Sequence, residues 1–152
     1  MIGEFTMDEL TKLWICNECQ QLVFLSWYYV DHGQASKMAD LFTEDAVFLI
    51  GLKEIRGKDE IRRMNRELEN KKGRMTRHLC TNFLLTSVSE TEAEGTTYLT
   101  LYGSEGEPGR EVSPLEAPMC LEECRDSFAK TREGWRLARR ELVTNFIRSL
   151  QA

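Results

Sequence analysis

The hydrophobic pattern of this sequence changes its period at Gly73, and that change constrains the fold more than any other feature. Before Gly73, apolar residues recur every three or four positions, as on helices; after it, long segments have the alternation and turn residues of strands. Helices followed by a run of strands indicate an α+β domain. We therefore predict three N-terminal helices packed on a curved, mostly antiparallel sheet, forming a cone with an internal pocket.

Turn residues set the expected limits of these elements. Helices are predicted over residues 8–30, 35–42 and 58–72, with Gly33 and Gly73 placed to end the first and the third. A turn at "TEDA", a short strand "AVFLI" and a loop or hairpin "GLKEIRG" lie between the second and third helices. Four long strand segments follow, over residues 74–90, 94–105, 117–133 and 134–146, and "FIRSLQA" is interpreted as a helical turn.

Length and composition limit the class of protein. A chain of 152 residues suits one domain, taken here as 1–152, with residues 1–6 interpreted as a cloning remnant or a disordered start. The net charge of −5 argues against nucleic-acid binding, which needs a basic face. The longest apolar run, "LVFLSWYYV", is too short to span a membrane, so we expect a cytoplasmic protein with no membrane partner.

The five cysteines suggest neither disulfides nor a metal site. Without a secretion signal, disulfides are not expected. "CNEC" at residues 16–19 has the spacing of a redox or metal site, but no second pair accompanies it and the segment has helical periodicity. Two cysteines on one helix face is the simpler interpretation, and no metal ligand is assigned.

Four segments resemble a known family, in the right order. "DHGQASKMADLFTEDAVF" is similar to the helix–turn–helix–strand opening of SnoaL-like proteins, and "EIRGKDEI" to the entry of their third helix. "TRHLCTN" and "GWRLARREL" resemble their first long strand and their last strand. The wider group is the nuclear-transport-factor-two-like, or cystatin-like, cone, which includes scytalone dehydratase, ketosteroid isomerase and polyketide cyclases but also non-catalytic members. Function must therefore be argued from the site.

The resemblance implies an acid–base pair made of Asp31 and His78. Strand alternation places His78 and Asn82 on one face, which lines the cone in the family. Helical spacing places Asp31, at the end of the first helix, on the aromatic stripe of that helix. In the resemblance the aspartate and the histidine face each other in the cavity. The expected substrate-binding residues are Phe24, Trp27, Tyr28, Asn82 and Tyr98.

This set of residues predicts cofactor-free chemistry on a hydrophobic hydroxy or keto compound. An imidazole with a pKa near ~6.5 exchanges protons near neutrality, and a carboxylate bonded to one ring nitrogen leaves the other for the substrate. A dehydratase, isomerase or polyketide cyclase of specialised metabolism fits. The resemblance also implies a homodimer through the outer face of the sheet.

Other interpretations of the same residues stay open. His78 is also compatible with a satisfied core or interface histidine, Asp31 with a turn residue before Gly33, and the aromatic stripe with core packing. The second active-site histidine of the scytalone dehydratase pattern is absent from "TTYLTLY", and the sheet aspartate of ketosteroid isomerase has no counterpart. The alternative to an enzyme is a non-catalytic ligand-binding or assembly subunit of the same fold.

Overall fold

The computed structural model describes residues 7–149, and the predicted cloning remnant at residues 1–6 lies outside them. The helices are α1 (Glu9–Asp31), the 3₁₀ helix η1 (Ala35–Leu41) and α2 (Lys58–Glu69). The strands are β1 (Phe42–Ile50), β2 (Lys53–Arg56), β3 (Arg74–Val88), β4 (Glu92–Glu105), β5 (Cys120–Thr131) and β6 (Gly134–Ile147). In this part of the chain, no helix is both long and apolar enough to cross a bilayer.

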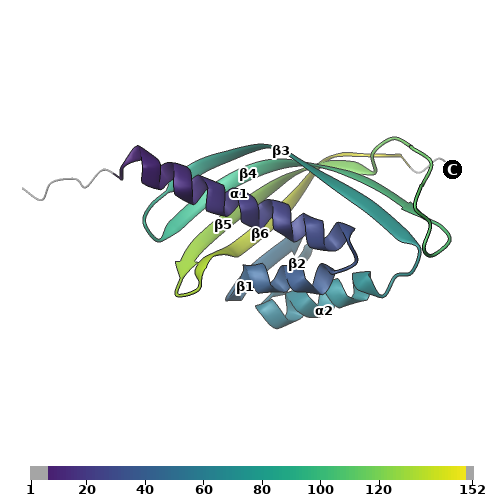
Figure 1. Cartoon of the computed structure of the whole chain (residues 1–152), viewed down its shortest axis with the longest axis horizontal. Coiled ribbons are helices and arrows are strands. Elements are labelled where there is room, and N and C mark those ends of the chain that lie inside the picture. The colour runs from purple at the N-terminus through teal and green to yellow at the C-terminus, as the bar shows by residue number, and fades with distance from the viewer. Residues whose placement is uncertain (1–6, 150–152) are drawn as a thin grey trace, which may run out of the picture.

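The six strands form one curved sheet in the order β2-β1-β6-β5-β4-β3. Only β1 and β6 run parallel; the other neighbours are antiparallel. Figure 1 shows α1 crossing in front of the long strands, while η1 and α2 lie together beside β1 and β2. The predicted α+β class, with helices on a curved sheet, is confirmed.

The first helix packs on the sheet through one stripe. Its N-terminus is capped by Asp8, whose carboxylate accepts a hydrogen bond from the Thr11 backbone N–H at 2.9 Å. The side chains that face the sheet recur at helical spacing: Ile15, Cys19, Val23, Trp27 and Val30. They meet a sheet layer that includes Leu99, Cys124, Phe128 and Leu137, and burial of these groups is the main stabilising contribution to the fold.

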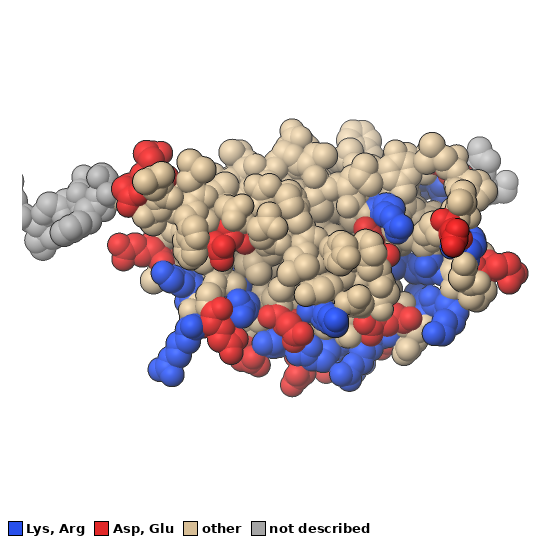
Figure 2. All heavy atoms as spheres, in the orientation of Figure 1, with Lys and Arg blue, Asp and Glu red and all other residues tan. Residues whose placement is uncertain are grey.

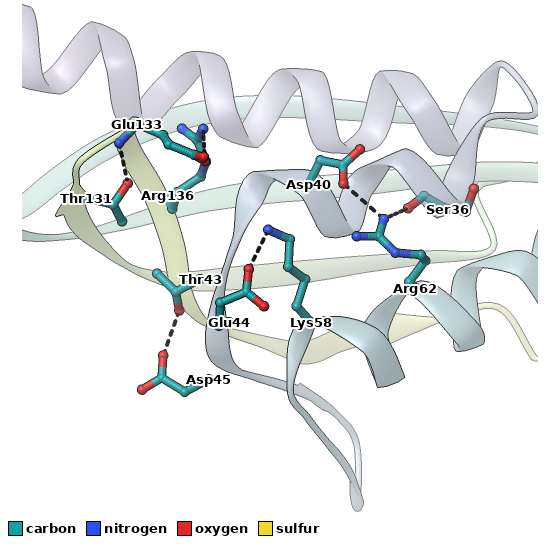
Figure 3. A network of polar contacts seen from close by, with 10 residues as sticks. All are labelled: Ser36, Asp40, Thr43, Glu44, Asp45, Lys58, Arg62, Thr131, Glu133 and Arg136. Atoms are coloured by element: carbon teal, nitrogen blue, oxygen red, sulfur yellow. Dashed lines mark hydrogen bonds and ion pairs between the residues drawn. The ribbon is translucent and has the colours of Figure 1, made fainter.

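Polar contacts hold the second helical layer together (Figure 3). Arg62 of α2 donates to Asp40 Oδ1 at 3.0 Å and to the Ser36 carbonyl at 3.4 Å, which ties α2 to η1. Lys58 Nζ lies 3.0 Å from Glu44 Oε1 and ties the start of α2 to β1. These links set the position of α2 over the end of the sheet.

Three local expectations were wrong. The "TEDA" segment is not a turn, because β1 begins already at Phe42 and absorbs these residues through a register irregularity between Phe42 and Val47. The predicted C-terminal helical turn is also not present in the described residues, since β6 continues to Ile147; residues 150–152 lie outside the description. The third helix also ends earlier than predicted, at Glu69 with Asn70 as its C-cap, so Gly73 does not end it. Gly73 instead lies in the turn before β3 with φ +77°, and a Cβ there would collide with the Gly106 carbonyl.

A buried ion pair joins β5 to β6 under α1. Arg140 Nε and Nη2 each donate to the Asp126 carboxylate at 2.8 Å, and Nη1 donates to Ser26 Oγ at 2.7 Å. The Arg140 side chain is 0% exposed. Neighbouring Arg139 is instead half exposed and lies 3.5 Å from Glu141.

These environments predict opposite outcomes for two adjacent substitutions. Arg140→Ala leaves Asp126 buried without its partner and should lower the free energy of unfolding by about 3–5 kcal/mol. Arg139→Ala removes a partly solvated pair and should cost less than about 1 kcal/mol. Urea unfolding followed by circular dichroism measures both; equal losses would contradict the assigned role of the buried pair.

Candidate active site

The carboxylate of Asp31 is the point at which α1 meets β3. Asp31 Oδ1 lies 2.6 Å from His78 Nδ1 and accepts a hydrogen bond from Thr76 Oγ1 at 2.9 Å. Its Oδ2 accepts from the His78 backbone N–H at 2.8 Å. The carboxylate is thus held by three donors from two residues of one strand, so its position relative to His78 is fixed by both backbone and side chain.

These donors outweigh the effect of burial on the pKa of Asp31. Burial by itself raises the pKa of this carboxyl. The side-chain and backbone hydrogen bonds from His78, the charge of that ring and the Thr76 hydroxyl act the other way, and the net pKa of Asp31 lies below its ordinary value. Asp31 is therefore ionised at neutral pH.

The His78 ring is fixed on two sides. Its Nδ1 contacts Asp31, which requires a proton on that nitrogen because an ionised carboxylate only accepts. Its ring stacks on Trp27 with centroids 4.5 Å apart and planes 17° from parallel. The other nitrogen, Nε2, forms no hydrogen bond with a described residue, and it is not completely buried. Nε2 is thus the ring atom available to a ligand.

A cavity of about 280 Å³ lies beside this ring. Its walls come from α1, η1, β1, α2 and β6 and are mostly apolar: Trp27, Val30, Met38, Phe48, Ile50, Met64, Leu68 and Leu142. His78 and Asn65 are polar members of the lining, and Lys53, Glu67, Lys71 and Arg74 complete it. A pocket with largely apolar walls beside a positioned imidazole can bind a small hydrophobic molecule and exchange protons with it.

The structure places some of the predicted site residues at the cavity and others away from it. Asp31 and His78 meet, and Trp27 lines the cavity. Phe24 packs against the core instead of lining the cavity. Tyr28 is 53% exposed and stacks on His32 at the helix end, 4.0 Å between centroids. The side of α1 that packs on the sheet contains Ser26 and Trp27 but not Tyr28, which lies about 100° further round the helix.

The expected orientations of Asn82 and Tyr98 were wrong. The pairing of β3 with β4 shifts between Thr81 and Leu84, and Asn82 sits in this bulge with φ 56° and an exposed side chain. Phe83 takes the inward position and packs edge-on against Phe128. Tyr98 lies between the buried residues Thr97 and Leu99 of β4, so alternation turns it to the outer face, where it is 47% exposed.

Sequence reasoning missed the contribution of α2. No site residue was predicted in the third helix, yet Asn65 is only 1% exposed and lines the cavity with Met64 and Leu68. The signal was available, because Ile61, Asn65 and Leu68 fall on one stripe at spacings of four and three. A polar residue within that stripe indicates a buried amide.

Two other reactive side chains lie near the dyad but do not line the cavity. The guanidinium of Arg140 donates to Asp126 and Ser26 and lies over the Trp27 ring. Burial raises the pKa of the Cys80 thiol to about 11, which makes it a poor nucleophile at neutral pH. His78 is the dyad residue that lines the cavity, and Asp31 acts on it through the contact with Nδ1.

Residues 11–141 match the sequence model of the SnoaL-like domain, which covers most of the chain. The chain belongs to the SnoaL-like family. No curated protein matches the sequence. Among residues 7–149, no three His, Cys, Asp or Glu side chains gather in a group able to hold a metal ion.

Solved structures share the fold of this SnoaL-like chain. A candidate scytalone dehydratase from Novosphingobium aromaticivorans has a TM-score of 0.76 at 22% identity, over 93% of this chain and 91% of that one. A hexachlorocyclohexane dehydrochlorinase, LinA type 2, has a TM-score of 0.75 at 16% identity, over 95% of each chain. A protein of unknown function with a cystatin-like fold, from Nostoc punctiforme, has a TM-score of 0.70 at 19% identity, over 93% and 96%. These likenesses establish the cystatin-like fold.

The lowered pKa of Asp31 predicts how the stability of this SnoaL-like protein depends on pH. Since the folded state favours the ionised carboxyl, its stabilisation is present above the unfolded pKa near ~3.9 and is lost as pH falls through the lower folded pKa. The difference in unfolding free energy between the native protein and Asp31→Asn should therefore shrink below about pH 4. Urea titrations from pH 7 to 3 measure it. Asp45→Asn, an exposed control, should show little difference at any pH.

Proposed function

We propose that this protein is a small cofactor-independent enzyme in which Asp31 and His78 act as an acid–base pair on a hydrophobic hydroxy or keto substrate. The observation that supports the proposal is the 2.6 Å contact between Asp31 Oδ1 and His78 Nδ1 beside an apolar cavity of about 280 Å³. A carboxylate in this place holds the proton on Nδ1 and leaves the lone pair of Nε2 for the substrate.

Proton transfer by Nε2 accounts for the candidate reactions. Nε2 removes a proton from the carbon next to a carbonyl, and the electron pair moves into an enolate. The imidazolium formed is stabilised by the ionised Asp31. It then returns the proton to a β-hydroxyl, which leaves as water, or to another carbon, which moves the double bond. In a cyclisation the enolate carbon attacks a second carbonyl of the same molecule, and the new alkoxide takes the proton. General acid–base help of this kind contributes about 10²–10⁴-fold in rate.

Trp27 positions the base in this mechanism. Its indole stacks on the His78 ring at 4.5 Å while Asp31 holds the edge of that ring, so the imidazole has little rotational freedom. A base fixed before the substrate arrives loses less entropy when the reaction begins. Trp27 also forms part of the apolar wall, which keeps water away from the enolate.

The alternative function is a non-catalytic ligand-binding or assembly subunit of the same fold. The outer face of the sheet favours it, because Leu79 and Tyr98 are 45% and 47% exposed there. Arg77 does not saturate the Asp31 carboxylate, however; it donates to the Asp31 and Thr76 backbone carbonyls. The dyad thus keeps its capacity for proton transfer, which supports the enzyme over the alternative.

We also propose that the outer face pairs two copies of the chain. Replacing both Leu79 and Tyr98 with Glu should convert a dimer to a monomer, because four buried carboxylates would oppose association. Sedimentation velocity measures the change. Leu52→Glu, at the exposed β1–β2 turn, is the control and should leave the mass unchanged. A native chain that sediments as a monomer would exclude this arrangement.

The acid–base proposal predicts that proton exchange depends on His78. A panel of apolar ketones and β-hydroxy ketones in D₂O, followed by NMR, should reveal exchange of α-protons or formation of enones. His78→Ala should lower the rate with a responding compound by at least about 10²-fold. His32→Asn is the matched control, because His32 is the other histidine of the chain and is solvent-exposed.

Two further measurements make the result interpretable. Urea unfolding should show that His78→Ala is still folded in water and unfolds cooperatively, although it loses one of the three donors to the Asp31 carboxylate; a folded variant excludes loss of fold as the cause. Native mass spectrometry of the purified protein identifies any molecule carried in the cavity, and that molecule joins the panel. Turnover unchanged in His78→Ala would remove the acid–base mechanism.

A further inference from the structure

The rim of the cavity beside His78 is positively charged. Lys53 of β2 and Lys71, just after α2, are exposed, and Arg74 at the start of β3 is partly exposed, while all three line the cavity. The apolar lining residues lie deeper. The cavity therefore opens between β2, the end of α2 and the start of β3, and basic side chains from three segments surround that opening.

These basic side chains have no acidic partner within the described chain. Neither Lys53, Lys71 nor Arg74 forms an ion pair or a side-chain hydrogen bond with any residue in the range 7–149. Glu67 is the acidic member of the lining, and it lies 3.6 Å from Arg63. The chain has 25 acidic and 20 basic residues, so acids were available to neutralise this rim. Figure 2 shows charges of both signs over the side of the molecule formed by η1 and α2.

A second polar feature lies deeper in the same cavity. Asn65 Nδ2 donates to the Ile61 carbonyl at 2.9 Å and contacts Met38 Sδ at 3.7 Å. The Ile61 carbonyl only accepts, so this orientation of the amide is fixed. Its Oδ1 accepts no hydrogen bond from a described residue, and this atom is not completely buried. Oδ1 therefore faces the cavity as an acceptor without a donor.

We propose that the cavity binds an amphipathic carboxylic acid: an apolar body, a carboxylate at the basic rim and a hydroxyl or N–H group that donates to Asn65 Oδ1. The inference rests on the proposed function only in taking this cavity as the substrate site. Three unpaired cations select an anion, and a buried acceptor selects a donor, because either is unfavourable when left unmatched in a filled pocket.

The geometry of β3 separates the carboxylate from the reacting atom. Arg74 and His78 lie on the same strand and the same face, four residues apart, or about 13 Å along the strand. The acid group therefore lies at the end of the apolar body remote from the proton that His78 moves. Binding energy from a remote group of this kind orients the reacting part of a substrate.

The C-terminal end of α2 opposes anion binding nearby, because the helix dipole is negative there. Lys71 follows this end directly, two residues beyond Glu69, and offsets it. The charge at the rim, counting Lys53, Lys71, Arg74 and Glu67, remains positive.

Binding of two matched probes tests the proposal. The probes are 2-naphthylacetate and its uncharged amide, 2-naphthylacetamide, measured by isothermal titration calorimetry at low and high salt. The carboxylate should bind at least about tenfold more tightly at low salt, since three cations at about 2–5-fold each act on it, and the preference should fall as salt screens them. The amide should show little dependence on salt.

Matched variants locate the effect. Lys71→Gln and Arg74→Gln should each weaken carboxylate binding about 2–5-fold and leave amide binding unchanged. Lys72→Gln is the control, because Lys72 is the exposed neighbour of Lys71 and does not line the cavity. The triple variant Lys53→Gln, Lys71→Gln, Arg74→Gln should bind both probes equally. Asn65→Leu should abolish any advantage of a 6-hydroxy derivative of the acid over the acid itself.

The outcomes separate this inference from the catalytic proposal. The preference for the carboxylate should persist in His78→Ala, because binding of the probes needs no turnover. Equal binding of acid and amide to the native protein, a preference that survives in the triple variant, or no binding of either probe would overturn the inference. A native protein that shows the carboxylate preference but exchanges no proton with any compound of the panel would count against the acid–base mechanism alone.

Discussion

The three hydrogen bonds that β3 donates to the Asp31 carboxylate are the interaction on which fold and site both depend. The carboxylate lies at the C-terminal end of α1, where the helix dipole disfavours negative charge. Donors from Thr76 and from the backbone and ring of His78 offset that cost. Because a shift of one residue along β3 would turn His78 to the other face, the same contact fixes the register of the strand against the helix.

A row of polar and aromatic groups continues from this contact through the interior. Trp27 stacks on His78, and the guanidinium of Arg140 lies over the Trp27 ring with Cζ 5.0 Å from its centroid. Asp126 in turn holds Arg140 with two 2.8 Å bonds. The row therefore joins β3 to β6 across the underside of α1. A buried ion pair of this type stabilises little in net terms, but it allows few alternative arrangements of the groups around it.

The sequence carried enough information for the order of elements and for the meeting of Asp31 with His78. Hydrophobic period distinguished helices from strands, and the family resemblance paired the two residues. The sequence did not predict the bulge at Asn82. One inserted residue turns every later side chain of the strand to the other face, and the only local sign of it is a residue type that tolerates positive φ. The predicted orientation of Tyr98 was wrong for a related reason, because the register of β4 on β3 is a long-range property. The prediction for Tyr28 was wrong because helical spacing alone does not say which side of Trp27 packs on the sheet; the structure buries Ser26 and leaves Tyr28 exposed.

The polar residue of α2 in the cavity, Asn65, was not predicted because charged residues surround it in the sequence. Arg66 and Glu67 directly follow Asn65 and give its segment the polarity of a solvated helix face, although Ile61 and Leu68 mark the buried stripe. In the folded chain the apolar walls, the dyad and the basic rim each contribute to binding the proposed ligand.

The overall charge of −5 opposes the approach of an anion at long range. That field is screened beyond about 8 Å at physiological ionic strength, whereas the three rim cations act within contact distance. Selection of an acid must therefore come from the rim. The net charge of the chain, which argued against nucleic-acid binding, does not report on a local site for a small anion.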